Sequence, residues 1–124
     1  MRVLIVEDEP IVAGYLESVV EGAGHAVAAV ASSVPEALGM LNESFDAALL
    51  DCNLQGVSAS PVAEALRQRR VPFIVMSGYQ RTHLPPELID APYLPKPSRG
   101  NNIRAALNEI ASALTRSEIG RAHV

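Results

Sequence analysis

At 124 residues the chain has the size of one domain, and 48% hydrophobic with 19% charged residues is ordinary for a globular protein with a buried core. The formal net charge of −4 argues against a nucleic-acid partner, because phosphate backbones attract basic surfaces. No apolar stretch approaches the roughly 20 residues of a membrane span. Because the N-terminal run is strand-like, we expect no signal peptide. Cys52 is the single cysteine, which excludes an intramolecular disulfide and favours a reducing compartment, so we expect a cytoplasmic protein.

Apolar runs alternate with helical patterns in the first half of the chain, which is typical of βαβ units. The expected strands are Arg2–Val6, a weaker run at Ala26–Val30, and Ala47–Leu50. Helices are expected at Ile11–Ala23, with Pro10 near its start, and at Pro35–Asn42, with Ser33 as a plausible N-cap.

The second half continues the alternation less regularly. Ser60-Pro61 opens a helix with Pro61 at its first position and Val62, Ala65 and Leu66 on one face. The remaining elements expected are strands at Phe73–Met76 and Tyr93–Leu94 and an amphipathic helix at Asn102–Leu114. Between them, Gly78–Pro92 contains several prolines, so a helix there must be short or absent. We expect a domain over residues 1–116 and a polar, fraying tail over 117–124.

Five strands alternating with helices predict an α/β fold, a doubly wound parallel sheet with the flavodoxin-like order 2-1-3-4-5. In that order the first and third strands are neighbours. Their carboxyl ends form the ligand crevice of such a sheet, so Glu7, Asp8 and Asp51 are expected to lie close together.

The charged residues that follow these strands indicate a site for Mg²⁺ and a phosphoryl group. Carboxylates that cluster repel one another unless a cation lies between them, and Mg²⁺ prefers oxygen ligands. Lys96 supplies a compact positive charge for a phosphoryl oxygen, and Ser77 supplies a hydroxyl. Each residue alone has a plainer interpretation: a solvated acidic loop for Glu7-Asp8-Glu9, a turn cap for Asp51, and turns for Ser77-Gly78 and Lys96-Pro97.

Four stretches, which together cover essentially the whole chain in the right order, resemble the receiver domain of a two-component response regulator, the CheY-like family. They are Val3-Leu4-Ile5-Val6-Glu7-Asp8-Glu9, Leu49-Leu50-Asp51, Val75-Met76-Ser77-Gly78 and Tyr93-Leu94-Pro95-Lys96-Pro97.

The resemblance implies a role for each matching residue. Asp51 would be the phosphoacceptor and a metal ligand. Asp8 would bind Mg²⁺ directly, Glu7 would act through a water molecule, and the backbone carbonyl of Asn53 would complete the protein ligands.

Ser77 and Lys96 would contact the phosphoryl oxygens in this family. Tyr93 would be the aromatic switch residue that turns inward when Ser77 moves, although a half-buried core aromatic is the plainer interpretation. Cys52 is expected to be a packed small apolar side chain.

The sequence departs from many receivers after the acceptor and after the fourth strand. It carries Asp51-Cys52-Asn53-Leu54-Gln55-Gly56 where others have a Met-Pro pair and a Gly. The stretch Phe73-Ile74-Val75-Met76-Ser77-Gly78-Tyr79 resembles the "FAT GUY" subgroup of stand-alone receivers, in which a Phe-Ala-Thr-Gly-Tyr-like motif accompanies a shortened or mobile fourth helix. Met76 and Ser77 replace the Ala and Thr of that motif.

The implied function is that of a single-domain response regulator. It would accept a phosphoryl group from a histidine kinase or phosphotransfer protein and signal to a downstream protein by direct contact. A receiver-like interaction module that is never phosphorylated is the alternative. An enzyme with sustained turnover is not expected, because Asn53 stands where a related phosphohydrolase needs a second acid.

Overall fold

A parallel sheet forms the centre of the molecule. The computed structural model describes residues 1–78, 84–89 and 91–122. The sheet has five strands in the order β2-β1-β3-β6-β7. They are β1 (Arg2–Val6), β2 (Ala26–Ala31), β3 (Ala47–Asp51), β6 (Phe73–Ser77) and β7 (Tyr93–Pro95). Numbered among themselves these strands follow the order 2-1-3-4-5, so the predicted flavodoxin-like topology is confirmed.

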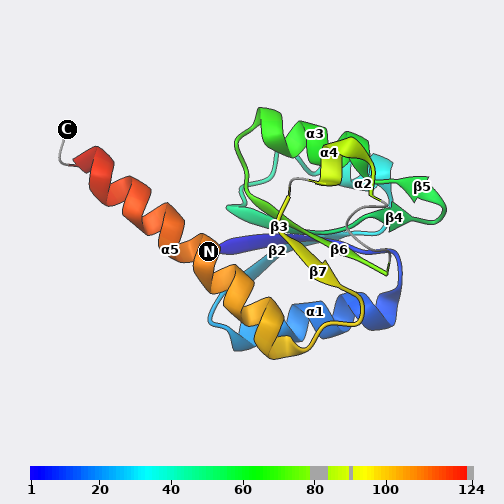
Figure 1. The fold of residues 1–124 in the computed structure, drawn as a ribbon, viewed down its shortest axis with the longest axis horizontal. Coiled ribbons are helices and arrows are strands. Elements are labelled where there is room, and N and C mark those ends of the chain that lie inside the picture. Colours follow the sequence, from blue (N-terminus) through cyan, green and yellow to red (C-terminus); the bar gives the residue numbers. More distant parts are fainter. Residues whose placement is uncertain (79–83, 90, 123–124) are drawn as a thin grey trace.

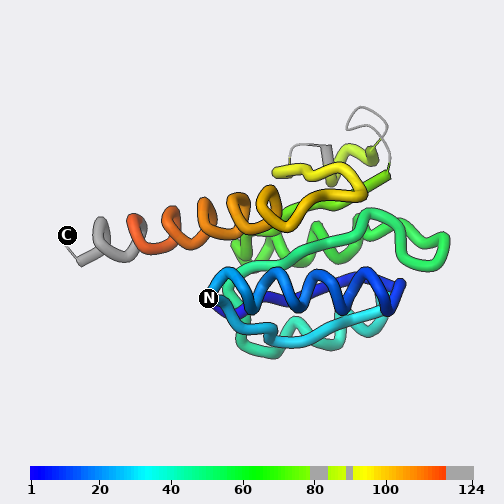
Figure 2. The backbone as a smooth tube through the Cα atoms, turned by 90° about the horizontal axis from the view of Figure 1, so that it is seen from below, coloured from blue at the N-terminus to red at the C-terminus, as the bar shows by residue number. Residues whose placement is uncertain are grey.

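Helices cover both faces of this sheet (Figure 1). One face carries α1 (Pro10–Gly22) and α5 (Gly100–Ala122), and the other carries α2 (Val34–Gly39), α3 (Ser60–Gln68) and the short α4 (Pro86–Ile89). Figure 2 shows α1 and α5 next to each other, with the far part of α5 extending past the rest of the domain. No helix in the described part of the chain is both long and apolar enough to cross a bilayer.

Two hydrophobic cores lie on opposite faces of the sheet, because successive strand residues point to opposite sides. Leu4 and Leu50 point to the first core, which they share with Leu66 of α3. Ile5 points to the second core, where Ile103 of α5 is completely buried. Both faces of the strands are therefore covered, which explains why their sequences are continuous apolar runs.

Helix starts agree with the sequence pattern in most places. The Ser33 side chain accepts a hydrogen bond from the Glu36 amide at 3.2 Å, so the predicted cap of α2 is confirmed. The helix itself ends at Gly39 and not at Asn42. At α3, Ala59 is the N-cap and Pro61 is the second helical residue, one position later than predicted.

A short antiparallel hairpin between the third strand and α3 was missed by the sequence prediction. Its strands are β4 (Asn53–Leu54) and β5 (Val57–Ser58). The two turn residues have positive φ angles, 55° at Gln55 and 82° at Gly56, as a tight hairpin turn requires. The Leu54 side chain is 1% exposed and anchors the hairpin to the first core.

The fourth helix is unusually short and the fifth is unusually long. The prediction of a short fourth helix is confirmed, since α4 has four residues. Tyr79 of the subgroup motif and residues 79–83 and 90 lie outside the described residues. The last helix begins at Gly100 and runs to Ala122, beyond the predicted Asn102–Leu114 on both sides. The backbone of residues 117–122 is helical, and the division at residue 116 stays a prediction.

We expect Leu66→Ala to lower the free energy of unfolding by about 2–5 kcal/mol, because it removes a fully buried side chain and leaves a cavity. Leu38→Ala is the control. That leucine is 40% exposed on α2, and its truncation should cost less than about 1 kcal/mol. Urea unfolding followed by circular dichroism measures both. Equal losses would contradict the placement of the core.

Candidate functional site

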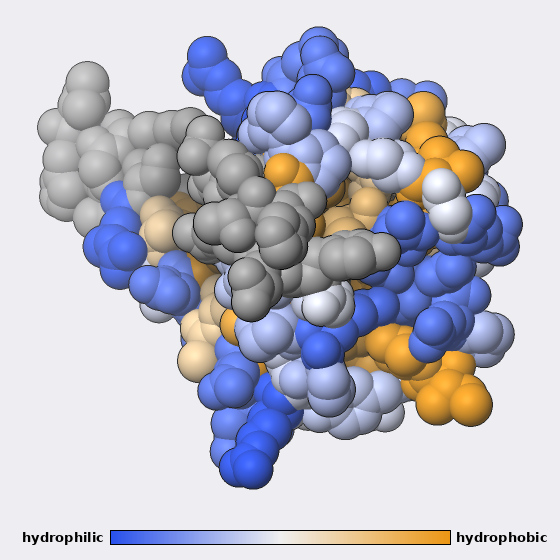
Figure 3. Space-filling view, turned by 45° about the vertical axis from the view of Figure 1, so that its right-hand side comes forward, coloured by the Kyte–Doolittle hydropathy of each residue, from blue (hydrophilic) through white to orange (hydrophobic). Residues whose placement is uncertain are grey.

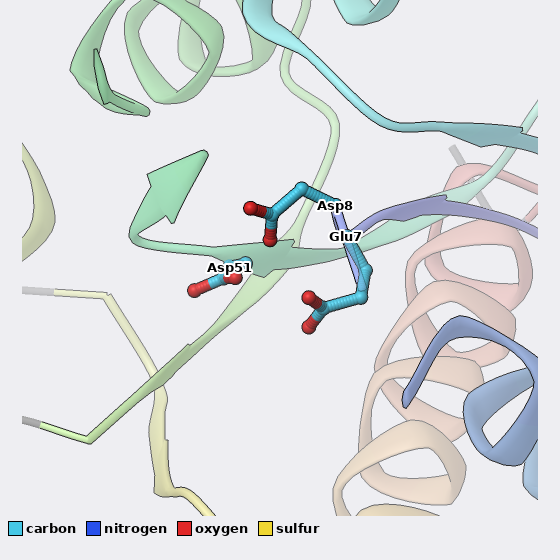
Figure 4. Close-up of side chains that lie close together, drawn as sticks. All are labelled: Glu7, Asp8 and Asp51. Carbon is cyan, nitrogen blue, oxygen red and sulfur yellow. The ribbon is translucent and has the colours of Figure 1, made fainter. Parts of the chain in front are cut away.

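Three carboxylates gather at the carboxyl ends of two neighbouring strands. Glu7 and Asp8 directly follow β1, and Asp51 is the last residue of β3. The strands pair in parallel with Val6 opposite Leu50, which places the following acids next to each other. Each residue offers a carboxylate oxygen, and these oxygens lie within 4.8 Å of one another (Figure 4). The expectation that these three residues meet is confirmed by this geometry.

Lys96 connects two of these carboxylates. Its Nζ atom donates to Glu7 Oε1 at 2.7 Å and to Asp51 Oδ2 at 3.0 Å. Lys96 follows directly after β7, and its backbone amide donates to the Ser77 carbonyl at 2.8 Å. It is also the only lysine in the sequence, so no other side chain of this type can replace it.

Burial and the neighbouring opposite charge shift the pKa values of Glu7 and Lys96 in opposite directions. The Glu7 carboxyl is 2% exposed, and its burial raises its pKa although Lys96 and the Glu9 amide act to lower it. Burial alone would lower the pKa of Lys96, but the carboxylates of Glu7 and Asp51 together raise it. The lysine is therefore held in its charged form, and it is the counter-charge that a buried Glu7 needs.

Asp8 lies on the more accessible side of the cluster. Partial burial acts to raise the pKa of its carboxyl, but hydrogen bonds, first among them the one from the Gln55 amide to Oδ2 at 3.0 Å, outweigh burial and lower it. The β4–β5 hairpin thus holds this carboxylate in its ionised form. The Asp51 carboxylate is restrained by the same segment, because the backbone amide of Asn53 donates to Asp51 Oδ1 at 3.3 Å.

The donor set fits a hard divalent cation. Carboxylate oxygens from Asp8 and Asp51 are the ligand type that Mg²⁺ prefers. Glu7 is predicted to act through a water molecule, and its Oε1 atom is paired with Lys96. The side chain of Asn53 accepts the Gly56 amide at 2.9 Å. The role of its backbone carbonyl as a metal ligand stays a prediction from the family resemblance.

Ser77 is the last residue of β6 and has no exposed surface. Its hydroxyl oxygen accepts a hydrogen bond from the Cys52 thiol at a sulfur–oxygen distance of 3.1 Å. Its carbonyl accepts both the Lys96 amide and, at 3.4 Å, the hydroxyl of the half-buried Tyr93. The two predicted switch residues, Ser77 and Tyr93, are therefore joined directly by a hydrogen bond in this structure.

Sequence reasoning missed two contributors to the site. Gln55 acts through its backbone, so its side chain carries no signal, although Gln55-Gly56 between the apolar Leu54 and Val57 is a turn pattern. Cys52 was correctly predicted to be buried, at 7% exposure, but its contact with Ser77 was not anticipated. That contact depends on the register of β3 against β6, where the Cys52 amide donates to the Met76 carbonyl.

A groove of about 490 Å³ opens next to the site between α1 and the segment after β7. Its lining includes Lys96 and Ile11, and Ile11 is 89% exposed. The β4–β5 hairpin lies on the other side of the sheet from α1 (Figure 1), and its Val57 is 54% exposed. The space-filling view of this end of the molecule shows hydrophobic patches beside a largely hydrophilic surface (Figure 3).

Comparison with known proteins matches residues 3–108 to the response regulator receiver domain. The chain belongs to this family. The match includes every residue of the acidic cluster together with Ser77 and Lys96, so the predicted resemblance to a CheY-like receiver is confirmed.

Individual receivers support the same assignment. The phyllosphere-induced regulator PhyR of Methylorubrum extorquens is 33% identical over 113 residues, which are 87% of this chain and 42% of that protein. This chain therefore spans less than half the length of that curated relative. The solution structure of SdrG from Sphingomonas melonis Fr1 is 34% identical, with a TM-score of 0.78, and the match covers 90% of this chain and 96% of SdrG.

A third receiver shows the shared fold with a bound ligand. TrrA of Thermotoga maritima, solved in complex with Mg²⁺ and BeF, has a TM-score of 0.77 over 88% of this chain and 97% of its own. At 22% identity the likeness concerns the fold alone. Receivers carry their Mg²⁺ site at an acidic cluster, and this receiver has an Asp/Glu cluster at the ends of β1 and β3.

We expect Lys96→Ala to lower the free energy of unfolding by about 1–3 kcal/mol, because it leaves the buried Glu7 carboxylate without its cation. Adding Glu7→Gln to this variant should restore part of the loss, since a neutral amide needs no counter-charge. Arg104→Ala on the exposed side of α5 is the control and should change little. Urea unfolding at neutral pH measures all four proteins, and a stable Lys96→Ala protein would mean that the pair is not desolvated.

Proposed function

We propose that this receiver accepts a phosphoryl group on Asp51 from a histidine kinase or a histidine phosphotransfer protein, in the presence of Mg²⁺. The observation that carries the proposal is the position of the Asp51 carboxylate. One of its oxygens lies 3.0 Å from the Lys96 ammonium, while the group as a whole belongs to the cluster with Glu7 and Asp8. The Asp51 carboxylate thus has the positive charge of Lys96 on one side and the acids Glu7 and Asp8, which can help to bind a cation, on the other. This environment suits a nucleophile for phosphoryl transfer.

The reaction needs little covalent assistance from the protein. A carboxylate oxygen of Asp51 attacks phosphorus, the new P–O bond forms as the P–N bond to the donor histidine breaks, and the imidazole keeps the electron pair and takes up a proton. Lys96 offsets the negative charge that develops on the phosphoryl oxygens. The carboxylates of Asp8 and Asp51 and the Asn53 carbonyl would hold Mg²⁺, with Glu7 acting through water, and the ion would supply further charge neutralisation.

Phosphorylation would be read through Ser77. Its hydroxyl and the Lys96 ammonium gain a contact with the phosphoryl group that the unmodified protein lacks, and a contact made in one state only shifts a conformational equilibrium. The Ser77 carbonyl accepts the Tyr93 hydroxyl, so a movement of Ser77 towards the acceptor changes the position of the aromatic ring. We therefore assign Tyr93 the switch role.

The proposed output is protein contact and not turnover of a substrate. Asn53 follows the acceptor, where a hydrolase would need a second acid, so only hydrolysis of the protein's own acyl phosphate is expected. The free cysteine is buried and suits a reducing compartment, which supports the cytoplasm as the location. A downstream protein partner, with neither nucleic acid nor membrane involved, completes the proposal.

Incubation with acetyl phosphate and Mg²⁺ should add one phosphoryl group to the wild-type protein, as measured by intact mass. Asp51→Asn should show no adduct, and neither should the wild type after Mg²⁺ is removed with a chelator. Asp46→Asn is the matched control. That aspartate accepts the Arg2 amide far from the cluster, an amide oxygen can still accept it, and the adduct should form normally.

An adduct that persists in Asp51→Asn would move the acceptor to another residue. No adduct on the wild type, together with no binding of Mg²⁺, would favour a receiver-like interaction module that is never phosphorylated.

Asp8→Asn should weaken Mg²⁺ binding by more than about tenfold, which is the lower end of the cost of losing even an outer-shell partner. The Gln55 amide donates to Asp8 in the structure, so its proton NMR shift is a direct reporter of a Mg²⁺ titration. Asp46→Asn should bind like the wild type. Unchanged affinity in Asp8→Asn would remove this residue from the metal site.

A further inference from the structure

The Cys52 thiol makes a buried contact that the proposed chemistry does not use. Its Sγ atom donates to Ser77 Oγ at 3.1 Å, across the boundary between β3 and β6. Both side chains are buried, with exposures of 7% and 0%. A thiol is a weak donor, and Cys52 immediately follows the proposed acceptor Asp51, so this weak bond ends on the hydroxyl that phosphorylation is proposed to recruit.

The backbone holds Cys52 in place much more firmly than its thiol holds Ser77. The Cys52 amide donates to the Met76 carbonyl at 3.1 Å, and the Cys52 carbonyl accepts the Ala59 amide at 3.0 Å. The sulfur also packs in the core beneath α3. If the Ser77 hydroxyl moves towards a phosphoryl group, the backbone of Cys52 stays in place, and we expect the contact to be lost in the phosphorylated state.

We infer that Cys52 is a positioning residue that restrains the Ser77 hydroxyl in the unphosphorylated state through the thiol–hydroxyl hydrogen bond. This inference rests on the proposed phosphorylation of Asp51. The restraint favours the resting conformation, because the bond exists only there. Its strength contributes to how readily the receiver switches, and a weak sulfur donor opposes the switch only slightly.

The thiol–hydroxyl contact can be tested without any phosphorylation, because the single cysteine has the only S–H stretching band in the infrared spectrum. Hydrogen bonding lowers the frequency of this band. Ser77→Ala should therefore move it to higher frequency, and Mg²⁺ with beryllofluoride should do the same in the wild type. Ser60→Ala is the control, since that half-buried hydroxyl is bonded to Ser58 and Glu87 instead, and it should leave the band unchanged.

Affinity for beryllofluoride, a mimic of the phosphoryl group, tests the effect of the restraint on switching. Cys52→Ala removes the donor and should bind about two- to fivefold more tightly than the wild type, the range expected for one weak hydrogen bond. Cys52→Ser keeps a donor and should bind as the wild type does or more weakly. In a Ser77→Ala background, Cys52→Ala should have no effect, because its only route of action is gone.

The outcomes separate the two proposals. A wild type that binds no beryllofluoride with Mg²⁺ overturns the proposed function and, with it, the role of Cys52 in switching. A wild type that binds normally, with Cys52→Ala equal or weaker in affinity, overturns the restraint alone. An effect of Cys52→Ala that persists without the Ser77 hydroxyl shows that packing, and not the hydrogen bond, is responsible. An S–H band that does not move in Ser77→Ala overturns the contact itself.

Discussion

The Lys96 ammonium lies between two carboxylates that belong to different strands, and much of the geometry at this end of the sheet depends on that charge. Glu7 is almost completely buried, and a buried carboxylate is costly unless a cation and hydrogen bonds compensate for it. The same ammonium contacts Asp51, so the ends of β1 and β3 are both tied to the segment that follows β7. With no second lysine in the chain, one side chain supports both the resting structure and the proposed reaction.

Ser77 is the second residue on which both the resting structure and the proposed switching depend. The Ser77 carbonyl accepts the Lys96 amide and the Tyr93 hydroxyl, while the Ser77 side chain accepts the Cys52 thiol. Two segments, the one that follows β3 and the one around β7, therefore meet at this residue of β6. A displacement of Ser77 would change its hydrogen bonds to the ends of β3 and β7 together, which is the physical basis of the proposed coupling between Asp51 and the surface near Tyr93.

Much of the fold follows from the sequence because its strongest signals are local. Continuous apolar runs mark strands that are buried on both faces, and the acids after Val6 and Leu50 mark the site because parallel strands end at the same edge. The order of the strands and the meeting of Glu7, Asp8 and Asp51 were predictable on this basis. Helix ends were less predictable, as the early stop of α2 at Gly39 shows.

The contacts that escaped prediction depend on tertiary register or on backbone atoms. The β4–β5 hairpin has strands of two residues each, too short for a periodic pattern, and its role is exerted by the Gln55 amide. The bond from Cys52 to Ser77 requires knowing how β3 is aligned with β6. The extension of α5 past Leu114 enters a polar stretch, where amphipathic periodicity gives no reason to continue a helix.

The separation of the hydrophobic core into two parts has a consequence for how this protein can change over evolution. Side chains beneath α2, α3 and α4 contact one face of the sheet, and those beneath α1 and α5 contact the other. Substitutions on opposite faces share few neighbours, so their effects should combine independently, whereas substitutions on one face must accommodate each other. A substitution in the core beneath α3 and α4 therefore need not disturb the packing of α1 against α5 or the groove beside Lys96.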